Sequence, residues 1–207
     1  MLEKNRKQLP IGIQTFSKIR EGNCYYVDKT AFALQLIQQG SYFFLSRPRR
    51  FGKSLFLDTL KELFEGNEPL FNGLAIHDSW DWKTQNPVIR ISFGDGVISG
   101  KEDLENSLSN WFATTAQDYQ HVFITKTLRN RFAELIRTFH EKTGQKVVIL
   151  IDEYDKPILD CIEQPQIAAE IRDVLLDVFS TIKDSDAHIR FVFITGVSNF
   201  PKASMFS

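Results

Sequence analysis

Four short apolar runs of strand-forming residues alternate along the chain with longer segments of helical periodicity. The third and fourth runs are almost continuously apolar, which is typical of strands covered on both faces, as in a parallel sheet. Strands that alternate with helices predict an α/β fold with a parallel sheet and right-handed crossovers. The four predicted strands occupy residues 41–46, 88–93, 146–152 and 189–196. We expect the last two to be the central strands.

Helical segments fill the intervals between these strands. Asp28 is expected to cap a helix that ends at Gly40, where the glycine would supply a left-handed residue. Directly after the first strand, residues 53–65 show an amphipathic pattern that Gly66 ends. Further helices are predicted near residues 102–115, 125–142 and 167–183.

The segment RPRRFGKS, residues 47–54, joins the first predicted strand to the amphipathic helix. A phosphate-binding loop reads G-x-x-x-x-G-K-[ST] in this context. Its backbone N–H groups bind phosphates, its lysine contacts the β- and γ-phosphates, and its hydroxyl binds Mg²⁺. Gly52, Lys53 and Ser54 match this pattern. Arg47 occupies the first glycine position, where backbone freedom is usual, and this departure weakens the match.

The same segment gathers positive charge at the start of a helix. Arg47, Arg49, Arg50 and Lys53 place four cations within seven residues, and a helix N-terminus itself favours an anion. A solvated basic turn is the alternative interpretation. The Gly-Lys-Ser sequence alone does not decide between a phosphate loop and such a turn.

Two adjacent carboxylates follow the third strand, in the segment KVVILIDEYD. Asp152 at the end of an apolar strand is typical of a residue that holds Mg²⁺, and Glu153 of one that orients or deprotonates an attacking water. A solvated strand-to-loop junction accounts for the acids but not for the basic loop that precedes them in the chain. The combination favours a nucleotide site.

Polar residues also follow the fourth strand. If this strand lies between the first and the third, a side chain at its end can hydrogen-bond the γ-phosphate or the water. Thr195 is our first choice for this role and Asn199 our second. For each residue singly, an ordinary strand-end turn is an equally good interpretation.

Four segments that contain these motifs are similar to segments of one known family. They are LPIGIQTFSKIREGNCYYVDKTAF, FFLSRPRRFGKSLFLDTLKELFEG, VVILIDEYDKPI and FVFITGVSNFPKASMFS, and they cover nearly the whole chain. The chain resembles the predicted AAA-ATPase-like family of bacterial proteins, whose members usually carry a C-terminal nuclease-like domain of the PD-(D/E)XK type. The resemblance implies a three-layer αβα P-loop NTPase fold with a mainly parallel sheet, in the division that uses an additional strand and a catalytic glutamate. It also makes Arg47 an expected member of the loop.

The resemblance implies a role for each motif residue, with ATP and Mg²⁺ as cofactors. Ser54 and Asp152 are the expected Mg²⁺ ligands. Glu153 is the expected catalytic base, and Lys53 is expected to contact the phosphates as a catalytic residue. Thr195, chosen from its place at the end of the fourth strand and not from the resemblance, is the third expected catalytic residue. The loop expected to bind ATP comprises Arg47, Pro48, Arg49, Arg50, Phe51, Gly52, Lys53, Ser54 and Leu55.

An N-terminal signature, YYVDKT, has no assigned role in this resemblance. We hypothesise that Tyr25 or Tyr26 packs near the adenine, because two adjacent aromatic residues stand beside a capped helix. The alternative interpretation is a core tyrosine together with the helix cap at Asp28.

We divide the chain into an N-terminal segment and helix, residues 1–40, and a P-loop core, residues 41–207. By resemblance the sheet has the order 5-1-4-3-2, and we identify neither a fifth strand, nor a helical lid, nor a nuclease-like segment before Ser207. The first strand is therefore expected at an exposed sheet edge, which favours self-association. A nuclease-like domain is an expected partner in a longer form.

Charge and cysteine content limit the remaining partners and compartments. The 25 Lys and Arg against 26 Asp and Glu leave a net charge of -1, so binding of a polyanion requires a local basic cluster. The charged N-terminus and the absence of a long apolar run predict a cytoplasmic protein with no membrane partner. Cys24 and Cys161 lie far apart and are interpreted as free thiols, with a disulfide as the alternative.

The leading hypothesis is an AAA-like domain that binds Mg-ATP and hydrolyses it to ADP and phosphate. One alternative is a nucleotide-dependent switch or interaction module with negligible turnover. Another is a nucleic-acid-binding accessory domain that uses the same basic cluster, which the near-zero net charge disfavours.

Overall fold

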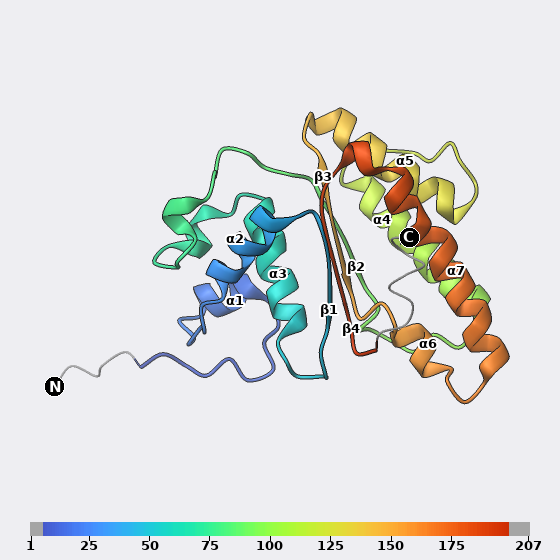
Figure 1. The fold of residues 1–207 in the computed structure, drawn as a ribbon, viewed down its shortest axis with the longest axis horizontal. Coiled ribbons are helices and arrows are strands. Elements are labelled where there is room, and N and C mark those ends of the chain that lie inside the picture. Colours follow the sequence, from blue (N-terminus) through green and yellow to red (C-terminus); the bar gives the residue numbers. More distant parts are fainter. Residues whose placement is uncertain (1–5, 199–207) are drawn as a thin grey trace.

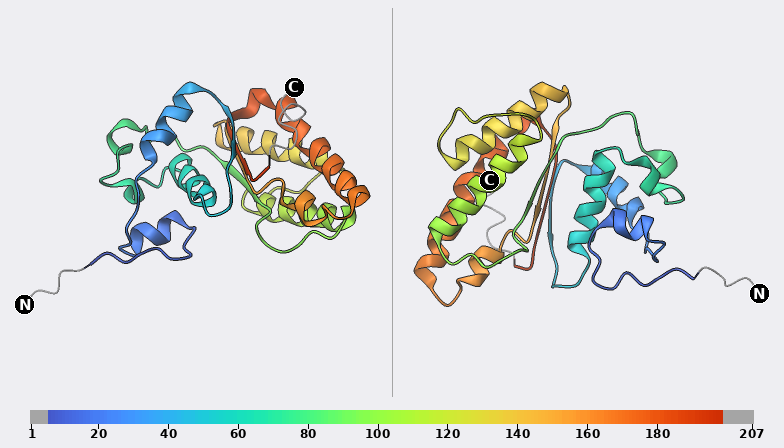
Figure 2. Two further views of the ribbon diagram at one scale, coloured as in Figure 1. Left: turned by 60° about the horizontal axis from the view of Figure 1, so that its bottom comes forward. Right: turned by 180° about the vertical axis from the view of Figure 1, so that it is seen from behind.

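The computed structural model of the 207-residue chain describes residues 6–198 and consists of three layers. A parallel sheet lies in the middle, with helices on both faces, as Figure 1 shows. In the two further views of Figure 2 the same two groups of helices stay on opposite sides of the sheet. The predicted α/β class and the three-layer αβα arrangement are therefore confirmed.

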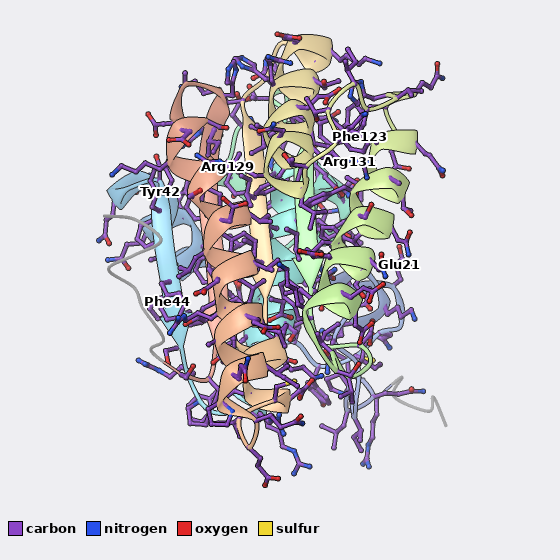
Figure 3. All side chains as sticks on the ribbon, turned by 90° about the vertical axis from the view of Figure 1, so that its right-hand side faces the viewer. Glu21, Tyr42, Phe44, Phe123, Arg129 and Arg131 are labelled. Carbon is purple, nitrogen blue, oxygen red and sulfur yellow. The ribbon has the colours of Figure 1, made fainter. Side chains whose placement is uncertain are left out.

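The sheet has four parallel strands in the order β1-β4-β3-β2. This order confirms that the fourth strand lies between the first and the third, as the resemblance implied. β4 and β3 are central, whereas β1 is at an edge and its five residues are half-buried. Figure 3 shows Tyr42 and Phe44 of β1 at this edge of the sheet, beyond the last long helix. The strands are β1 Tyr42–Ser46, β2 Val88–Ser92, β3 Val147–Asp152 and β4 Ile189–Gly196.

Seven α-helices cover the sheet within the described residues. α1 (Phe16–Glu21), α2 (Thr30–Gln39) and α3 (Lys53–Phe64) lie on one face. The other face carries α4 (Lys101–Gln117), α5 (Leu128–Thr143), α6 (Lys156–Asp160) and α7 (Pro165–Asp184). The five long helices were all predicted within a few residues. The two short helices were not, because five or six residues show too little periodicity to be recognised.

The two faces of the sheet belong to two separate apolar clusters. Val148 and Leu150 of β3 pack with α1 to α3, whereas Val147, Ile149 and Ile151 pack with α4 to α7. Every residue of β3 is therefore buried. This double burial is the physical reason for the unbroken apolar run in the sequence.

The ends of α2 differ in part from the prediction. Lys29 holds the N-cap position, but the Asp28 carboxylate accepts hydrogen bonds from Thr30 N (2.8 Å) and Thr30 Oγ1 (2.7 Å). Gly40 is not left-handed, because its φ of 176° is extended. The chain turns from α2 into β1 without a left-handed residue at this position.

Neither cysteine forms a disulfide, and both Cys24 and Cys161 are buried. Among residues 6–198, no helix combines the length and apolar character that crossing a bilayer requires.

Candidate functional site

The predicted site residues that lie within the described chain gather at the carboxyl ends of β1, β3 and β4. In a parallel sheet these ends share one edge, and the loops that leave them form a common surface. The Gly-Lys-Ser motif lies where the β1–α3 loop enters α3, Asp152 ends β3 and Glu153 follows it, and β4 ends at Thr195 and Gly196. Asn199, the second choice for a sensing residue, lies outside the described residues.

The backbone of the β1–α3 loop does not require a glycine at position 47. Arg47 N donates a hydrogen bond to Gly196 O at 3.2 Å, so Arg47 continues the ladder between β1 and β4. Positive φ values occur instead at Arg50 (66°) and Gly52 (76°). Only the residue at position 52 is a glycine, which takes this conformation without steric strain. The arginine in place of the first glycine therefore imposes no backbone strain.

The start of α3 presents unused hydrogen-bond donors to this loop. Gly52 is the N-cap residue, and among residues 6–198 no side chain caps the helix. The side chains of Arg47, Arg49 and Arg50 are exposed around it. A helix N-terminus with free backbone N–H groups and nearby cations attracts a phosphate.

Lys53 lies beneath the loop rather than in solvent. Its side chain is almost fully buried, and its Nζ donates to Arg47 O and to Pro48 O, each at 3.0 Å. The ammonium group thus stabilises the loop through two of its carbonyls. A phosphate that enters the loop would offer Lys53 a stronger, charged acceptor than these two carbonyls.

The acidic half of the site is built on β3 and β4. Asp152 is 3% exposed, and its Oδ1 accepts a hydrogen bond from Thr195 Oγ1. The same hydroxyl accepts a hydrogen bond from Glu153 N at 3.2 Å. Thr195 therefore bonds the Asp152 carboxylate and the Glu153 backbone, which places three of the predicted residues in one contact group.

Glu153 has an unusual backbone for a non-glycine residue, with φ of 53°. Its carboxylate approaches Gly94, where an added Cβ would lie 3.5 Å from Glu153 Oε2. Non-glycine residues with a positive φ occur preferentially at functional sites. Gly94, two residues after β2, was not singled out by the sequence, because a lone glycine after a strand is typical of an ordinary turn.

Only β4 separates the phosphate loop from the acids. With about 4.8 Å between neighbouring strands, the ends of β1 and β3 are about 10 Å apart. Within residues 6–198, no three His, Cys, Asp or Glu residues cluster in a way that would hold a metal by themselves. Mg²⁺ needs no such cluster here, since it takes one or two protein oxygens together with phosphate oxygens. The Ser54 hydroxyl and the Asp152 carboxylate are hard oxygen donors that fit this ion.

An aromatic cavity of about 250 Å³ opens beside the phosphate loop. Phe51 and Phe32 are largely exposed at 59% and 63%. Tyr25 and Tyr26 do not line this cavity. Tyr26 packs against Phe16 with ring centroids 5.1 Å apart, which agrees with the alternative interpretation of a core tyrosine. The cavity is lined by Lys29, Phe32, Leu36, Phe43, Phe44, Leu45, Phe51, Gly52, Lys53, Phe56 and Phe193.

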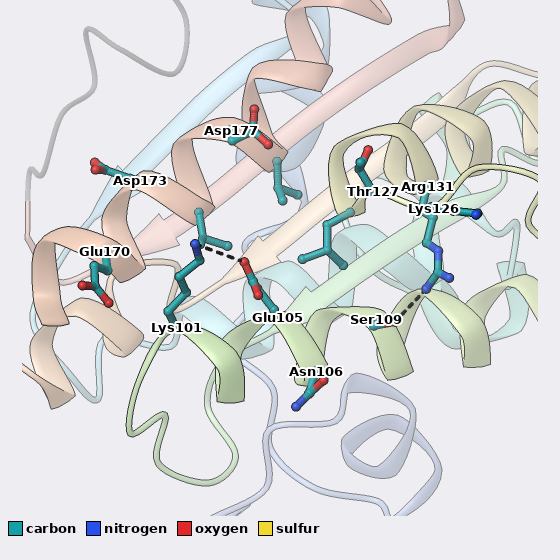
Figure 4. A pocket seen from close by; sticks show the side chains of 13 residues that line it. Lys101, Glu105, Asn106, Ser109, Lys126, Thr127, Arg131, Glu170, Asp173 and Asp177 are labelled. Atoms are coloured by element: carbon teal, nitrogen blue, oxygen red, sulfur yellow. Dashed lines mark hydrogen bonds and ion pairs between the residues drawn. The ribbon is translucent and has the colours of Figure 1, made fainter.

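A larger groove of about 940 Å³ lies between α4, α5 and α7. Figure 4 shows its mixed charges: Lys101 is paired with Glu105 at 3.8 Å, and Arg131 donates to Ser109 Oγ at 2.7 Å. None of the predicted site residues lines it. Although this groove is larger than the aromatic cavity, it is therefore not the candidate site. The wall formed by α7 carries Glu170, Asp173 and Asp177.

The parallel αβα sandwich and the Gly-Lys-Ser loop at the start of α3 define a protein of the P-loop NTPase class. Comparison with known families gives the narrower assignment. The chain belongs to the AAA-ATPase-like family, since the model of that family, described as "Predicted AAA-ATPase", matches residues 10–206. Membership of this family indicates nucleotide binding.

A curated relative extends this comparison to an individual protein. The chain is 60% identical over 204 residues to a protein of Azotobacter chroococcum mcd 1, which is titled "Uncharacterized protein in vnfD 5'region". The match covers 98% of this chain and 40% of the relative. No solved structure matches the chain significantly.

Proposed function

We propose that this chain is an ATP-binding domain that hydrolyses ATP to ADP and phosphate with Mg²⁺. One observation carries the proposal. The uncapped start of α3, with its basic loop, shares one end of the sheet with the hydrogen-bonded pair Asp152 and Thr195. A cytoplasmic location is part of the same proposal.

Each residue then has a distinct task. Lys53 stabilises charge on the β- and γ-phosphates, and the N–H groups at the start of α3 bind the same oxygens. Ser54 and Asp152 would hold Mg²⁺, which neutralises phosphate charge when bound. Glu153 orients the attacking water and accepts its proton.

Thr195 connects these groups. Its hydroxyl bonds both Asp152 and the backbone of Glu153, so it fixes the acids relative to β4. Arg47, Arg49 and Arg50 remain exposed and supply further positive charge around the phosphates.

The aromatic cavity supplies a place for the nucleobase. It is bounded by Gly52 and Lys53, so it is continuous with the phosphate loop. Phe51 and Phe32 offer exposed ring faces, and stacking of a base on an aromatic side chain contributes about 1–3 kcal/mol. We therefore assign the base to Phe51 and Phe32 rather than to Tyr25 or Tyr26.

Binding and turnover can be tested separately. Mg-ATP binding should fall at least about tenfold in Lys53→Ala, because a hydrogen-bonded charge contributes about 1.5–3 kcal/mol. Lys101→Ala in the distant groove is the matched control and should bind normally. Titration calorimetry measures the affinity, and normal Mg-ATP binding by Lys53→Ala would contradict the proposal.

The assignment of the nucleobase to Phe51 is tested by comparing ATP with a ligand that has phosphates but no base. Phe51→Ala should weaken ATP binding about tenfold and leave binding of inorganic tripolyphosphate unchanged. Equal weakening of both ligands would show that Phe51 acts through the loop and not through the base.

A nucleotide-dependent switch with negligible turnover is the second candidate. The observation that favours it is the bonding of Lys53 Nζ to two loop carbonyls, because a phosphate that took over these bonds would change what holds the loop. Binding of Mg-ATP without phosphate release by the unmutated chain would favour the switch.

A further inference from the structure

Asp155 is a buried carboxylate that the motif-based assignment of roles leaves unused. It lies three residues after Asp152, at the N-cap of α6, and is fully buried. Its carboxylate accepts hydrogen bonds from Val197 N (2.9 Å), Ser198 N (2.6 Å) and Ser198 Oγ (2.5 Å). No ion pair of Asp155 occurs among residues 6–198. All these bonds come from the two residues that follow β4.

The segment held in this way touches both halves of the candidate site. Gly196 O accepts the bond from Arg47 N, and Val197 O accepts a bond from Ser46 Oγ at 3.1 Å. Thr195, just before it, bonds Asp152 and Glu153. A displacement of this segment therefore changes the relative position of the phosphate loop and the acids.

Gly196 allows the close approach on which this arrangement depends. A Cβ at that position would lie 2.9 Å from Asp155 Oδ1 and 2.6 Å from Tyr154 Cε1. Both distances are shorter than a non-bonded contact of a Cβ atom allows, so a side chain at position 196 would push the segment away from Asp155.

We propose that Asp155 is a positioning residue of the nucleotide site. It holds residues 196–198 so that Thr195 and the phosphate loop keep their places relative to Asp152. The proposal rests on the proposed function, because its kinetic consequence requires that the site hydrolyses ATP. Asp155 itself contacts neither phosphate nor water in this role.

The chain contains a matched control in Glu134 on α5. Its carboxylate is 3% exposed and accepts bonds from Ile124 N, Thr125 N and Thr125 Oγ1. It therefore holds a loop by the same pattern of two successive backbone N–H groups and one hydroxyl. That loop joins α4 to α5 and carries none of the predicted site residues.

The experiment compares Asp155→Asn with Glu134→Gln in the full chain. Asp155→Asn should lower kcat for phosphate release about tenfold or more while the Kd for Mg-ATP stays within about threefold. Glu134→Gln should lower the melting temperature and leave kcat unchanged at a temperature where both variants are folded. An equal loss of kcat in both variants, or no loss in Asp155→Asn, overturns the proposal.

A second variant and a second measurement protect the test. If Asp155→Asn does not fold, Ser198→Ala should lower kcat about threefold with an unchanged Kd, and a normal kcat overturns the proposal.

Amide hydrogen exchange measures how firmly each segment is held, and it does not require that the chain hydrolyses ATP. Asp155→Asn, or Ser198→Ala in its place, should increase exchange in residues 47–53 as well as 195–198, whereas Glu134→Gln should not. Absence of phosphate release from the unmutated chain contradicts the proposed hydrolysis, and the exchange result then decides the positioning role.

Discussion

Asp155 and Glu134 hold their loops by the same local chemistry in two different regions of the molecule. Each carboxylate is buried and accepts two successive backbone N–H groups and one hydroxyl from the loop it holds. Glu134 also accepts a bond from His121 Nε2 at 2.9 Å. The loop of Glu134 carries Phe123, which Figure 3 shows near Arg131 of α5. The loop of Asp155 instead adjoins the phosphate loop.

This comparison separates stability from function. A buried carboxylate with its hydrogen bonds satisfied stabilises a loop wherever it occurs. Only the contacts of that loop decide whether the stabilisation affects a reaction. The predictions below ask whether the two regions differ in this way.

The largest expected difference between the two regions is in kcat, when one glutamate in each region is replaced by glutamine. Glu153→Gln should lower kcat for phosphate release by about 10²–10⁴-fold, the usual loss when a general base is removed. Glu134→Gln should leave kcat unchanged. Steady-state phosphate release measures both, and Mg-ATP binding by Glu153→Gln should persist. A reduced kcat in Glu134→Gln would show that the two regions are coupled.

The next difference concerns glycines. Gly196→Ala should lower the free energy of unfolding by about 1–3 kcal/mol, because its new methyl group overlaps Tyr154 and Asp155 and overpacking has this effect. Gly100 lies at the start of α4, and a Cβ added there meets nothing within 4 Å. Gly100→Ala should therefore lower the free energy of unfolding by less than about 1 kcal/mol. Urea unfolding measures both. Similar losses at the two positions would refute the tight approach at Gly196.

The dependence of stability on pH tests the Glu134 region alone. Burial by itself would raise the pKa of Glu134, but the bonds from Thr125, Ile124 and His121 outweigh it and lower the pKa to about 2 from the ordinary 4.5. Because the folded pKa is the lower one, the stabilisation is complete above pH 4.5 and is lost as the pH falls toward 2. One proton gives a slope of up to about 1.4 kcal/mol per pH unit.

Glu134→Gln is the control for this pH effect. Its unfolding free energy should fall less steeply between pH 4.5 and pH 2 than that of the unmutated chain. Urea unfolding at several pH values gives both slopes, and identical slopes would contradict the role assigned to the Glu134 carboxylate.

The smallest expected effect removes one hydroxyl from each loop. Ser198→Ala and Thr125→Ala should each lower the free energy of unfolding by about 1 kcal/mol. Only Ser198→Ala should also slow phosphate release. If both variants slow it, the hydroxyl at position 198 acts through general stability and not through the site.

Much of the fold was predictable because burial leaves a direct pattern in the sequence. β3 is apolar throughout since both of its faces are covered, and α3 shows a clear apolar side. The short helix α6 was missed because its five residues span less than two helical turns, too few for an apolar stripe to repeat. The left-handed residue predicted at Gly40 was wrong, because glycine at a helix end permits that conformation but does not require it.

The candidate site was predictable to a similar extent. Lys53, Asp152 and Thr195 lie at or just after strand ends in recognisable motifs, and the structure brings Asp152 and Thr195 into contact. Asp155 and Gly196 were not singled out. The signal for Asp155 is a third acid in the IDEYD segment, but nothing local shows that its partners lie about 40 residues further along the chain.

The sequence alone determined the class of fold, the order of the motifs and the charge of the loop that follows β1. These follow from periodicity, from turn residues and from the charge of neighbouring side chains, all of which are local properties. The tertiary structure decided that Arg47 takes a strand position, that Lys53 bonds the loop carbonyls, and that Asp155 holds the end of β4. Such contacts join residues far apart in the chain, and their free energy exists only when the sheet has brought them together.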